Sequence, residues 1–201
     1  MKTTIHDLLC IEDSLNSTSI NEKDTNFIYV TRFDDFTTAE FYKTFLRLQG
    51  DPSVKIIPIV ISSFGGAVHS LLPMIDLIES SQKPVATIAL GKAMSCGAVL
   101  LAAGTKGYRF SSANTEVMIH EVSSGTMGKT TEIKHDIAWT DRLNSKLFTL
   151  LAKYAGKKDS KFFIKEMKKR GNLDWFLTSA EAKKIGLVDH VAVPNLMRGH
   201  R

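Results

Sequence analysis

The sequence predicts an α/β fold with parallel pairing of its strands. Short apolar runs alternate along the chain with amphipathic segments of helical period, which is the order expected of strand–helix units. Two of these runs, Lys55–Ser62 and Val85–Leu90, are apolar almost throughout, as expected of strands buried on both faces. The chain has 201 residues, 43% of them hydrophobic, and can therefore build one domain with a substantial core.

The folded domain is expected to span residues 27–193. Residues 1–26 are polar and carry Ser and Thr clusters, so we expect a flexible N-terminal arm or pro-segment there. Residues 194–201 are expected to form a C-terminal tail. We find no internal repeat in the sequence.

The domain should begin with a short buried strand at Phe27–Val30, followed by a helix. Thr37–Glu40 has the pattern of a capping box, and Gly50 is placed to end the helix. Between them, one helical face carries Phe41, Phe45 and Leu48.

Lys55–Ser62 is the next predicted strand, and Pro58 within it indicates a bulge or an edge position. Ser63–Gly66 breaks the strand. A helix should follow from about Ser70 to Glu79, with Pro73 tolerated near its first turn.

A strand from Val85 and a helix ending near Gly104 should flank a turn of small residues. The remaining elements are expected in this order: strands Lys106–Phe110 and Val117–His120, helices Thr130–Ala155, Lys161–Lys169 and Ala180–Ile185, and a closing strand Leu187–Val193. The long helix has an apolar stripe made by Ile133, Ile137, Leu143, Leu147, Leu151 and Tyr154. This stripe is longer than one small domain needs, so part of it is expected to pack against a facing subunit.

Charge and composition narrow the classes of function. The net charge of +5 comes from scattered basic residues. The densest basic run, Lys157–Arg170, has little aromatic interleaving and is interpreted as a solvated helix face, so no nucleic-acid partner is expected. No cofactor and no metal are expected either.

The cellular location is expected to be cytoplasmic. Two cysteines, Cys10 and Cys96, give no disulfide framework and favour a reducing compartment. Residues 1–14 lack the apolar core and cleavage site of a signal peptide. The most apolar stretch, Val85–Gly104, is interrupted by Lys92 and predicts a buried core segment rather than contact with a membrane.

Ser95 is the first candidate for chemistry, because it lies at the turn between a buried strand and a buried helix. The free N–H groups and the positive dipole end of the helix would stabilise a negative oxygen there, as a serine nucleophile requires. A serine in this place is more often a simple N-cap. The hydrolase pattern G-x-S-x-G is also incomplete, since Ala93 replaces its first glycine.

Three further places could supply partners for Ser95. The pair Gly65 and Gly66 follows a buried strand and opens a helix, where α/β folds bind ligands. His120 ends a second strand, and Asp174 lies between two apolar stretches, at a turn or helix cap. Each feature alone is ordinary, but together they provide a nucleophile, a base, an orienting carboxylate and backbone donors for an oxyanion.

The order of these motifs resembles the ClpP family, the proteolytic subunit of the Clp protease. The resemblance covers about residues 27–193, and its most specific blocks surround Ser95 and His120. The matching segments, in order, are Ser63–Val68, Gly91–Ala98, Val117–His120, Asp174–Leu177 and Ser179–Asp189.

This resemblance implies a serine endopeptidase that acts on unfolded polypeptides or peptides without using ATP itself. It implies Ser95 as nucleophile, His120 as general base, Asp174 as its orienting carboxylate, and oxyanion donors from the backbone of Gly66 and Cys96. The implied fold is a ClpP/crotonase-like spiral of ββα units with a protruding helical handle at residues 123–155. The implied assembly is a homo-oligomer of two stacked heptameric rings, with an AAA+ unfoldase as a candidate partner.

The chain departs from the family pattern at several places. Phe64 stands where Pro is usual, and Glu121-Val122 replaces Gln-Pro after the histidine. We expect Phe64, Gly65 and Val122 to lie along the substrate groove. The spacing from His120 to Asp174 is a few residues longer than usual, so Glu121 and Asp136 are alternative orienting carboxylates.

Three other functions compete with this interpretation. Gly125–Thr131 follows a strand and opens a helix, as a phosphate-binding loop would, but that motif requires glycine where Ser123 stands. A crotonase-like acyl-CoA enzyme would use an oxyanion hole without a nucleophile, and the pairing of Ser95 with His120 argues against it. A non-catalytic ring partner of an active subunit is the third alternative.

Overall fold

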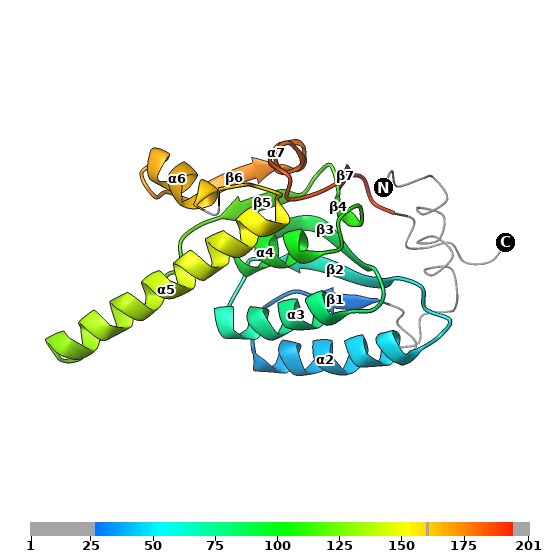
Figure 1. Cartoon of the computed structure of the whole chain (residues 1–201), viewed down its shortest axis with the longest axis horizontal. Coiled ribbons are helices and arrows are strands. Elements are labelled where there is room, and N and C mark those ends of the chain that lie inside the picture. Colours follow the sequence, from blue (N-terminus) through cyan, green and yellow to red (C-terminus); the bar gives the residue numbers. More distant parts are fainter. Residues whose placement is uncertain (1–26, 160, 195–201) are drawn as a thin grey trace.

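The computed structural model describes residues 27–159 and 161–194 of the chain (Figure 1). The expected arm over residues 1–26 lies outside the described residues, as does the expected tail beyond residue 194. The described part is an α/β fold, as the alternation of apolar runs predicts, with a seven-stranded sheet and helices packed on it.

Five parallel strands follow one another across the sheet in the order β1-β2-β3-β4-β7. They are β1 (Ile28–Val30), β2 (Ile57–Ser63), β3 (Val85–Met94), β4 (Arg109–Ser111) and β7 (His190–Val191). The long β3 is paired with β4 along its first half and with β5 (Glu116–Ile119) along its second half. The carboxyl ends of β3 and β5 therefore lie side by side.

The seventh strand corrects the sequence prediction. No strand was predicted after Asp174, but β6 (Trp175–Thr178) begins directly after that residue. Trp175 and Leu177 are buried while Phe176 and Thr178 are exposed, which is the alternation of a strand with one covered face. β6 pairs with β5 in the antiparallel sense, whereas the prediction was of parallel pairing.

Four helices lie together on one face of the sheet (Figure 1): α2 (Asp35–Gly50), α3 (Val68–Ser80), α4 (Cys96–Ala103) and α5 (Thr130–Tyr154). α4 consists of small and aliphatic residues, and all of them are buried against the sheet, α3 and α5. The shorter α6 (Phe162–Lys169) packs on α5, and α7 (Ser179–Ile185) follows β6. None of the helices in the described ranges combines the length and apolar character needed to cross a membrane.

Two helices begin two or more residues earlier than predicted. α2 is capped by Asp34, whose carboxylate accepts a hydrogen bond from the Thr37 N–H at 2.7 Å, so the capping box predicted at residues 37–40 is wrong. α3 begins at Val68 rather than at Ser70. Pro73 consequently lies in the second turn of α3 rather than in its first.

Pro58 causes neither a bulge nor an edge in β2, which is paired on both sides. The N–H of Ile57 donates to Pro84 on the β3 side, so the nitrogen of Pro58 points to the opposite side. There the pairing with β1 begins only at Ile59, so the missing N–H removes no hydrogen bond from the sheet. The register shift of β2 falls nearer its end, between residues 61 and 63.

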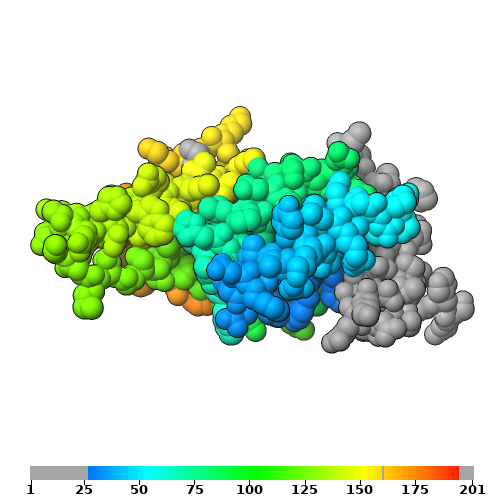
Figure 2. Space-filling view, turned by 90° about the horizontal axis from the view of Figure 1, so that it is seen from below, coloured from blue at the N-terminus to red at the C-terminus, as the bar shows by residue number. Residues whose placement is uncertain are grey.

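The outer half of α5 projects away from the body, and we call α5 the handle helix (Figures 1 and 2). Helix occupies residues 130–154 of the expected handle, and residues 123–129 form an extended connection. The predicted apolar stripe is divided between two environments. Its inner part is buried within the chain, at Leu143, Leu147 and Leu151, while the Ile137 side chain farther out is 53% exposed.

A buried arginine ties the end of the chain to the sheet. Arg109 of β4 makes two hydrogen bonds to the carboxylate of Asp189, at 2.6 and 2.8 Å. Its remaining terminal nitrogen donates to the carbonyls of Tyr154 and Gly186, at the C-terminal ends of α5 and α7. The guanidinium therefore lies where two helix dipoles and a carboxylate all favour a positive charge.

We expect Asp189→Asn to lower the free energy of unfolding at neutral pH by about 3 kcal/mol, because it leaves the buried Arg109 charge without its counter-ion. Denaturant titration measures this loss. Glu40→Gln is the matched control, since Glu40 pairs with Lys43 on the surface and should change stability by less than about 1 kcal/mol.

The same pair should make stability depend on acid pH. Burial raises the pKa of Asp189, but the hydrogen bonds and charge of Arg109 outweigh burial and hold that pKa below its usual range. A lowered pKa in the folded state contributes stability above the unfolded value of about 3.9, and the contribution disappears as pH falls through the folded value. Unfolding free energy should therefore decline more steeply below about pH 4 in the unmodified chain than in Asp189→Asn; parallel curves would contradict this account.

Candidate active site

Ser95 is the single residue between β3 and α4, and its backbone is strained. Its φ of 54° and ψ of −120° are rarely adopted by residues other than glycine and cost on the order of 1–3 kcal/mol. The Ser95 N–H donates to the Met118 carbonyl of β5 at 2.8 Å, which holds the turn in place. Although Ser95 occupies the N-cap position, its side chain makes no capping hydrogen bond. The hydroxyl is therefore available for another partner.

That partner is His120, which follows β5 directly. Met94 of β3 and Met118 of β5 are paired in register, so the residues just beyond them lie next to each other. The Ser95 Oγ and the His120 Nε2 are 2.8 Å apart, within hydrogen-bond distance. The sheet thus brings together a hydroxyl and an imidazole that are 25 residues apart in sequence.

Asp174 lies on the other side of His120, because it precedes β6 and Trp175 pairs with Ile119. Its Oδ1 is 3.6 Å from the His120 Nδ1, which is longer than a hydrogen bond. The Asp174 side chain is 52% exposed and that of His120 is 26% exposed. The three predicted residues are therefore neighbours in the predicted order, with one hydrogen bond and one longer contact between them.

Two glycines pack closely around the serine turn. A Cβ added to Gly65 would lie 2.7 Å from the Ser95 Cβ, and one added to Gly66 would lie 2.4 Å from the Phe33 carbonyl oxygen. Both have positive φ, so both positions require glycine. The Gly65 N–H donates to the Ser63 hydroxyl at 3.0 Å, whereas Gly66 lines the cavity beside Ser95. Of the two glycines, Gly66 is the better placed to present its N–H to a ligand.

Cys96 is the first residue of α4, so its N–H has no acceptor within the helix. Its thiol donates to the Gly66 carbonyl, with sulfur and oxygen 3.3 Å apart. Burial raises the pKa of this thiol to about 11, so it stays protonated and can act as a donor at neutral pH. One hydrogen bond thus connects the two predicted oxyanion residues.

A cavity of about 250 Å³ opens beside Ser95 and His120, between α3, α4 and the handle helix. Its inner wall is apolar and is made mainly by Val99, Leu143, Leu147, Phe148 and Leu151. The sequence analysis missed this cavity. The signal available was the four-residue spacing of leucines on the inner half of the handle helix, which was interpreted as a contact with a facing subunit.

The residues expected along a substrate groove are separated in the structure. Val122 lines the cavity, and its N–H donates to the Asn144 side chain at 2.6 Å, a contact that sequence reasoning missed. Phe64 and Gly65 are not part of the cavity wall. The Phe64 ring is 71% exposed, and the Lys92 ammonium lies 4.4 Å from its centroid.

The segment Gly125–Thr131 was considered as a phosphate-binding loop. In the structure its backbone binds a carboxylate of the chain itself. The Glu132 carboxylate accepts a hydrogen bond from the Lys129 N–H at 2.9 Å. A negative charge in this place repels a phosphate and uses the donor that would bind it. Among residues 27–159 and 161–194, no three His, Cys, Asp or Glu side chains are close enough to hold a metal ion.

A comparison with protein families gives a match over most of the chain. The model of the Clp protease family matches residues 12–195. The matched range includes Ser95, His120 and Asp174 and extends over most of the chain. The chain therefore belongs to the Clp protease family.

Proposed function

We propose that the chain is a serine endopeptidase subunit that hydrolyses peptide bonds of unfolded polypeptides without using ATP. The observation that carries the proposal is the 2.8 Å contact between the Ser95 hydroxyl and His120, at the mouth of an apolar cavity. A base in hydrogen-bond contact with a hydroxyl is the arrangement that activates a serine nucleophile. Family membership supports the same class of reaction.

In this mechanism Ser95 attacks the peptide carbonyl while His120 takes the hydroxyl proton. His120 then passes that proton to the departing amine, leaving an acyl group on Ser95. A water molecule, activated by the same imidazole, cleaves the acyl-enzyme and restores the serine.

The N–H groups of Gly66 and Cys96 are proposed to stabilise the oxyanion formed in both steps. The Cys96 N–H lies at the positive end of α4, where a developing negative charge is favoured. Each donor of this kind contributes roughly 10²–10³ in rate. The thiol hydrogen bond from Cys96 to Gly66 keeps the two segments at a fixed separation.

Asp174 is proposed to orient His120 and to stabilise the imidazolium that forms during the reaction. Catalytic hydrogen bonds are often long before substrate binds and shorten in the complex. The Asp174 carboxylate and His120 Nδ1 are proposed to approach from 3.6 Å to hydrogen-bond distance in this way. Of the three carboxylates, Asp174 is the one that lies within 4 Å of a His120 nitrogen, and Asp136 instead accepts a hydrogen bond from Thr126.

Assembly into two stacked heptameric rings in the cytoplasm, with an AAA+ unfoldase as a candidate partner, is part of the proposal. The exposed apolar side chain of Ile137 on the projecting part of the handle helix supports a contact between subunits. A closed chamber would confine the sites and admit only unfolded chains. The expected substrate groove residues Phe64, Gly65 and Val122 would then face the chamber interior.

Two other functions remain alternatives. A crotonase-like enzyme would need the oxyanion donors but not the contact between Ser95 and His120, so that contact favours hydrolysis. A non-catalytic ring partner would have the same fold but an unreactive serine. Labelling with a fluorophosphonate separates both from the hydrolase, since only an activated serine reacts.

We expect Ser95→Ala to abolish cleavage of short fluorogenic peptides in the absence of ATP and to leave the fold intact. The reason is that the hydroxyl bonds to His120 and is not one of the buried side chains of the core. Peptide turnover and circular dichroism measure the two effects. Ser112→Ala, a hydroxyl outside the site, is the control, and undiminished turnover in Ser95→Ala would remove the serine from the mechanism.

Asp174→Asn should lower kcat by about two to four orders of magnitude with little change in KM, because the amide favours the wrong tautomer of His120. Steady-state kinetics with the same peptides test this. Glu121→Gln and Asp136→Asn are matched controls that should keep kcat. If one of these controls loses activity while Asp174→Asn keeps it, the orienting role belongs to the residue that was changed in that control.

Ile137→Asp should break the assembly into smaller particles without unfolding the chain, because a charge on an apolar subunit contact is costly to bury. Light scattering measures the particle mass. Thr149→Asp is the control. It places the same charge at an exposed position on the inner half of the handle helix and should leave the particle intact. An unmodified chain that is active as a monomer would rule out the ring.

A further inference from the structure

The basic segment, residues 157–170, lies beside the candidate site and carries the whole net charge of the chain. It holds seven basic and two acidic residues, a net charge of +5, which equals the net charge of all 201 residues. We propose that the basic segment, together with the exposed apolar side chains of Leu173 and Phe176, binds acidic stretches of the unfolded polypeptides that the site cleaves. This inference rests on the proposed function and names the class of substrate that the site prefers.

The charges of the basic segment face solvent because the apolar side chains of α6 occupy its other face. Phe163 and Met167, one turn apart, are buried. The Phe163 ring contacts the ring of Trp175, with centroids 6.1 Å apart, and α6 packs on the handle helix. Six of the seven basic side chains are exposed, and the seventh, Lys157, is half-buried. The segment therefore offers a charged outer face to a ligand.

Part of this positive charge has no counter-ion in the segment. The two carboxylates there are already used, because Asp159 pairs with Lys165 at 2.7 Å and Glu166 pairs with two basic neighbours at 2.6 and 2.9 Å. In the part of the chain that the structure describes, no carboxylate forms an ion pair with the remaining exposed lysines of the segment, which are Lys158, Lys161 and Lys168. Like charges one helical turn apart repel one another, so an acidic ligand would relieve a repulsion that the free chain keeps.

The C-terminal end of α6 adjoins the site. The guanidinium of Arg170, the C-cap residue of α6, lies 3.9 Å from the centroid of the Trp175 ring. Trp175 directly follows Asp174 and pairs with Ile119, the residue before His120. Arg170 precedes Asp174 by four residues, which span at most about 14 Å, and α6 itself is about 12 Å long. A substrate that is held at the site and extended at about 3.3 Å per residue thus reaches the basic segment with residues roughly four to eight positions from the scissile bond.

The surroundings of these charges favour a polypeptide over a nucleic acid as the ligand. Leu173 is 70% exposed and Phe176 is 53% exposed, so apolar side chains of an unfolded chain have partners next to the lysines. Single-stranded nucleic acids are bound by exposed aromatic rings on which successive bases stack. Here Phe163 and Trp175 are buried, and Arg170 covers the Trp175 ring. A polypeptide stretch that contains both acidic and apolar residues matches both features of the surface.

The alternative is that the basic segment only keeps the chain soluble. The two roles differ in their effect on peptide turnover. A surface that binds substrate raises kcat/KM for peptides with an acidic stretch by about tenfold or more, because clustered positive charge attracts them. It also loses this effect in salt, since the Debye length falls from about 30 Å at 0.01 M to about 3 Å at 1 M. A merely solvated face produces neither result.

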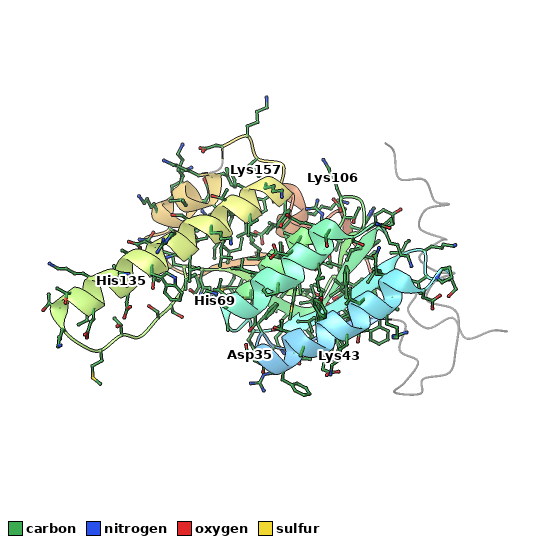
Figure 3. All side chains as sticks on the ribbon, turned by 60° about the horizontal axis from the view of Figure 1, so that its bottom comes forward. Asp35, Lys43, His69, Lys106, His135 and Lys157 are labelled. Carbon is green, nitrogen blue, oxygen red and sulfur yellow. The ribbon has the colours of Figure 1, made fainter. Side chains whose placement is uncertain are left out.

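The test uses the full-length chain and internally quenched peptides that share one cleavage sequence and carry a block of Glu, Gln or Lys residues at that distance from the scissile bond. Each block is made on the amino side and on the carboxyl side. The variant is Lys161→Glu/Lys168→Glu, and the matched control Lys43→Glu/Lys55→Glu makes the same change in charge at two exposed positions elsewhere. Lys43 lies on α2, away from the start of the basic segment at Lys157 (Figure 3). Labelling by a fluorophosphonate is measured for every protein.

At about 0.01 M ionic strength, the unmodified chain should cleave the Glu peptide of at least one orientation with a kcat/KM about tenfold above that of the Gln peptide. At about 1 M the two values should be equal. Lys161→Glu/Lys168→Glu should remove or invert the preference and keep turnover of the Gln peptide, whereas the control should retain the preference. Equal rates for the Glu and Gln peptides at low salt, or the same loss in both variants, overturn the inference and leave the proposed function standing.

Competition by nucleic acid distinguishes the other class of ligand. If a single-stranded RNA inhibits cleavage at a lower concentration than a non-cleavable Glu peptide of the same charge, the basic segment is a nucleic-acid surface and the inference is wrong. If the unmodified chain neither labels with the fluorophosphonate nor cleaves the Gln peptide, the proposed function itself fails, and this inference fails with it.

Discussion

The hydrogen bond between the Ser95 N–H and the Met118 carbonyl is the interaction on which the site depends. It attaches a one-residue turn with unfavourable backbone angles to the neighbouring strand, and so offsets part of the strain that the turn stores. The same bond fixes β5 in register with β3, and His120 follows two residues after Met118. A shift of β5 by one residue would turn the imidazole away from the serine, because side chains alternate between the two faces of a sheet.

The helix that follows the Ser95 turn, α4, is also fixed in place, because it is buried. Every residue of α4 is buried between the sheet, α3 and the handle helix, so Cys96 and its N–H have little freedom to move. The handle helix has two roles along its length. Its inner half provides the apolar wall of the cavity, while its outer half projects with Ile137 exposed. The buried Arg109 fixes the inner end of this helix through the Tyr154 carbonyl.

Sequence reasoning selected site residues that lie close together in the structure, but it placed several boundaries of the elements incorrectly. Ser95, His120 and Asp174 were identified because each ends or begins an apolar run, and the structure places all three together. The capping box at residues 37–40 was wrong because Asp34 competes for the same N–H group. β6 was missed because a four-residue strand between two short helices offers too short a pattern to identify alone.

The sequence by itself determined the α/β class, the order of the elements apart from β6, and the glycines at positions 65 and 66, because periodicity and backbone freedom are properties of short segments. Only the tertiary structure decided how far the Asp174 carboxylate lies from His120, which half of the handle helix is buried, and where a cavity forms. These features depend on which surfaces of distant segments meet. The stacking of His69 on Trp139, residues 70 positions apart, cannot be inferred from either residue's neighbours in sequence, since it exists only after α3 and the handle helix have packed on α4.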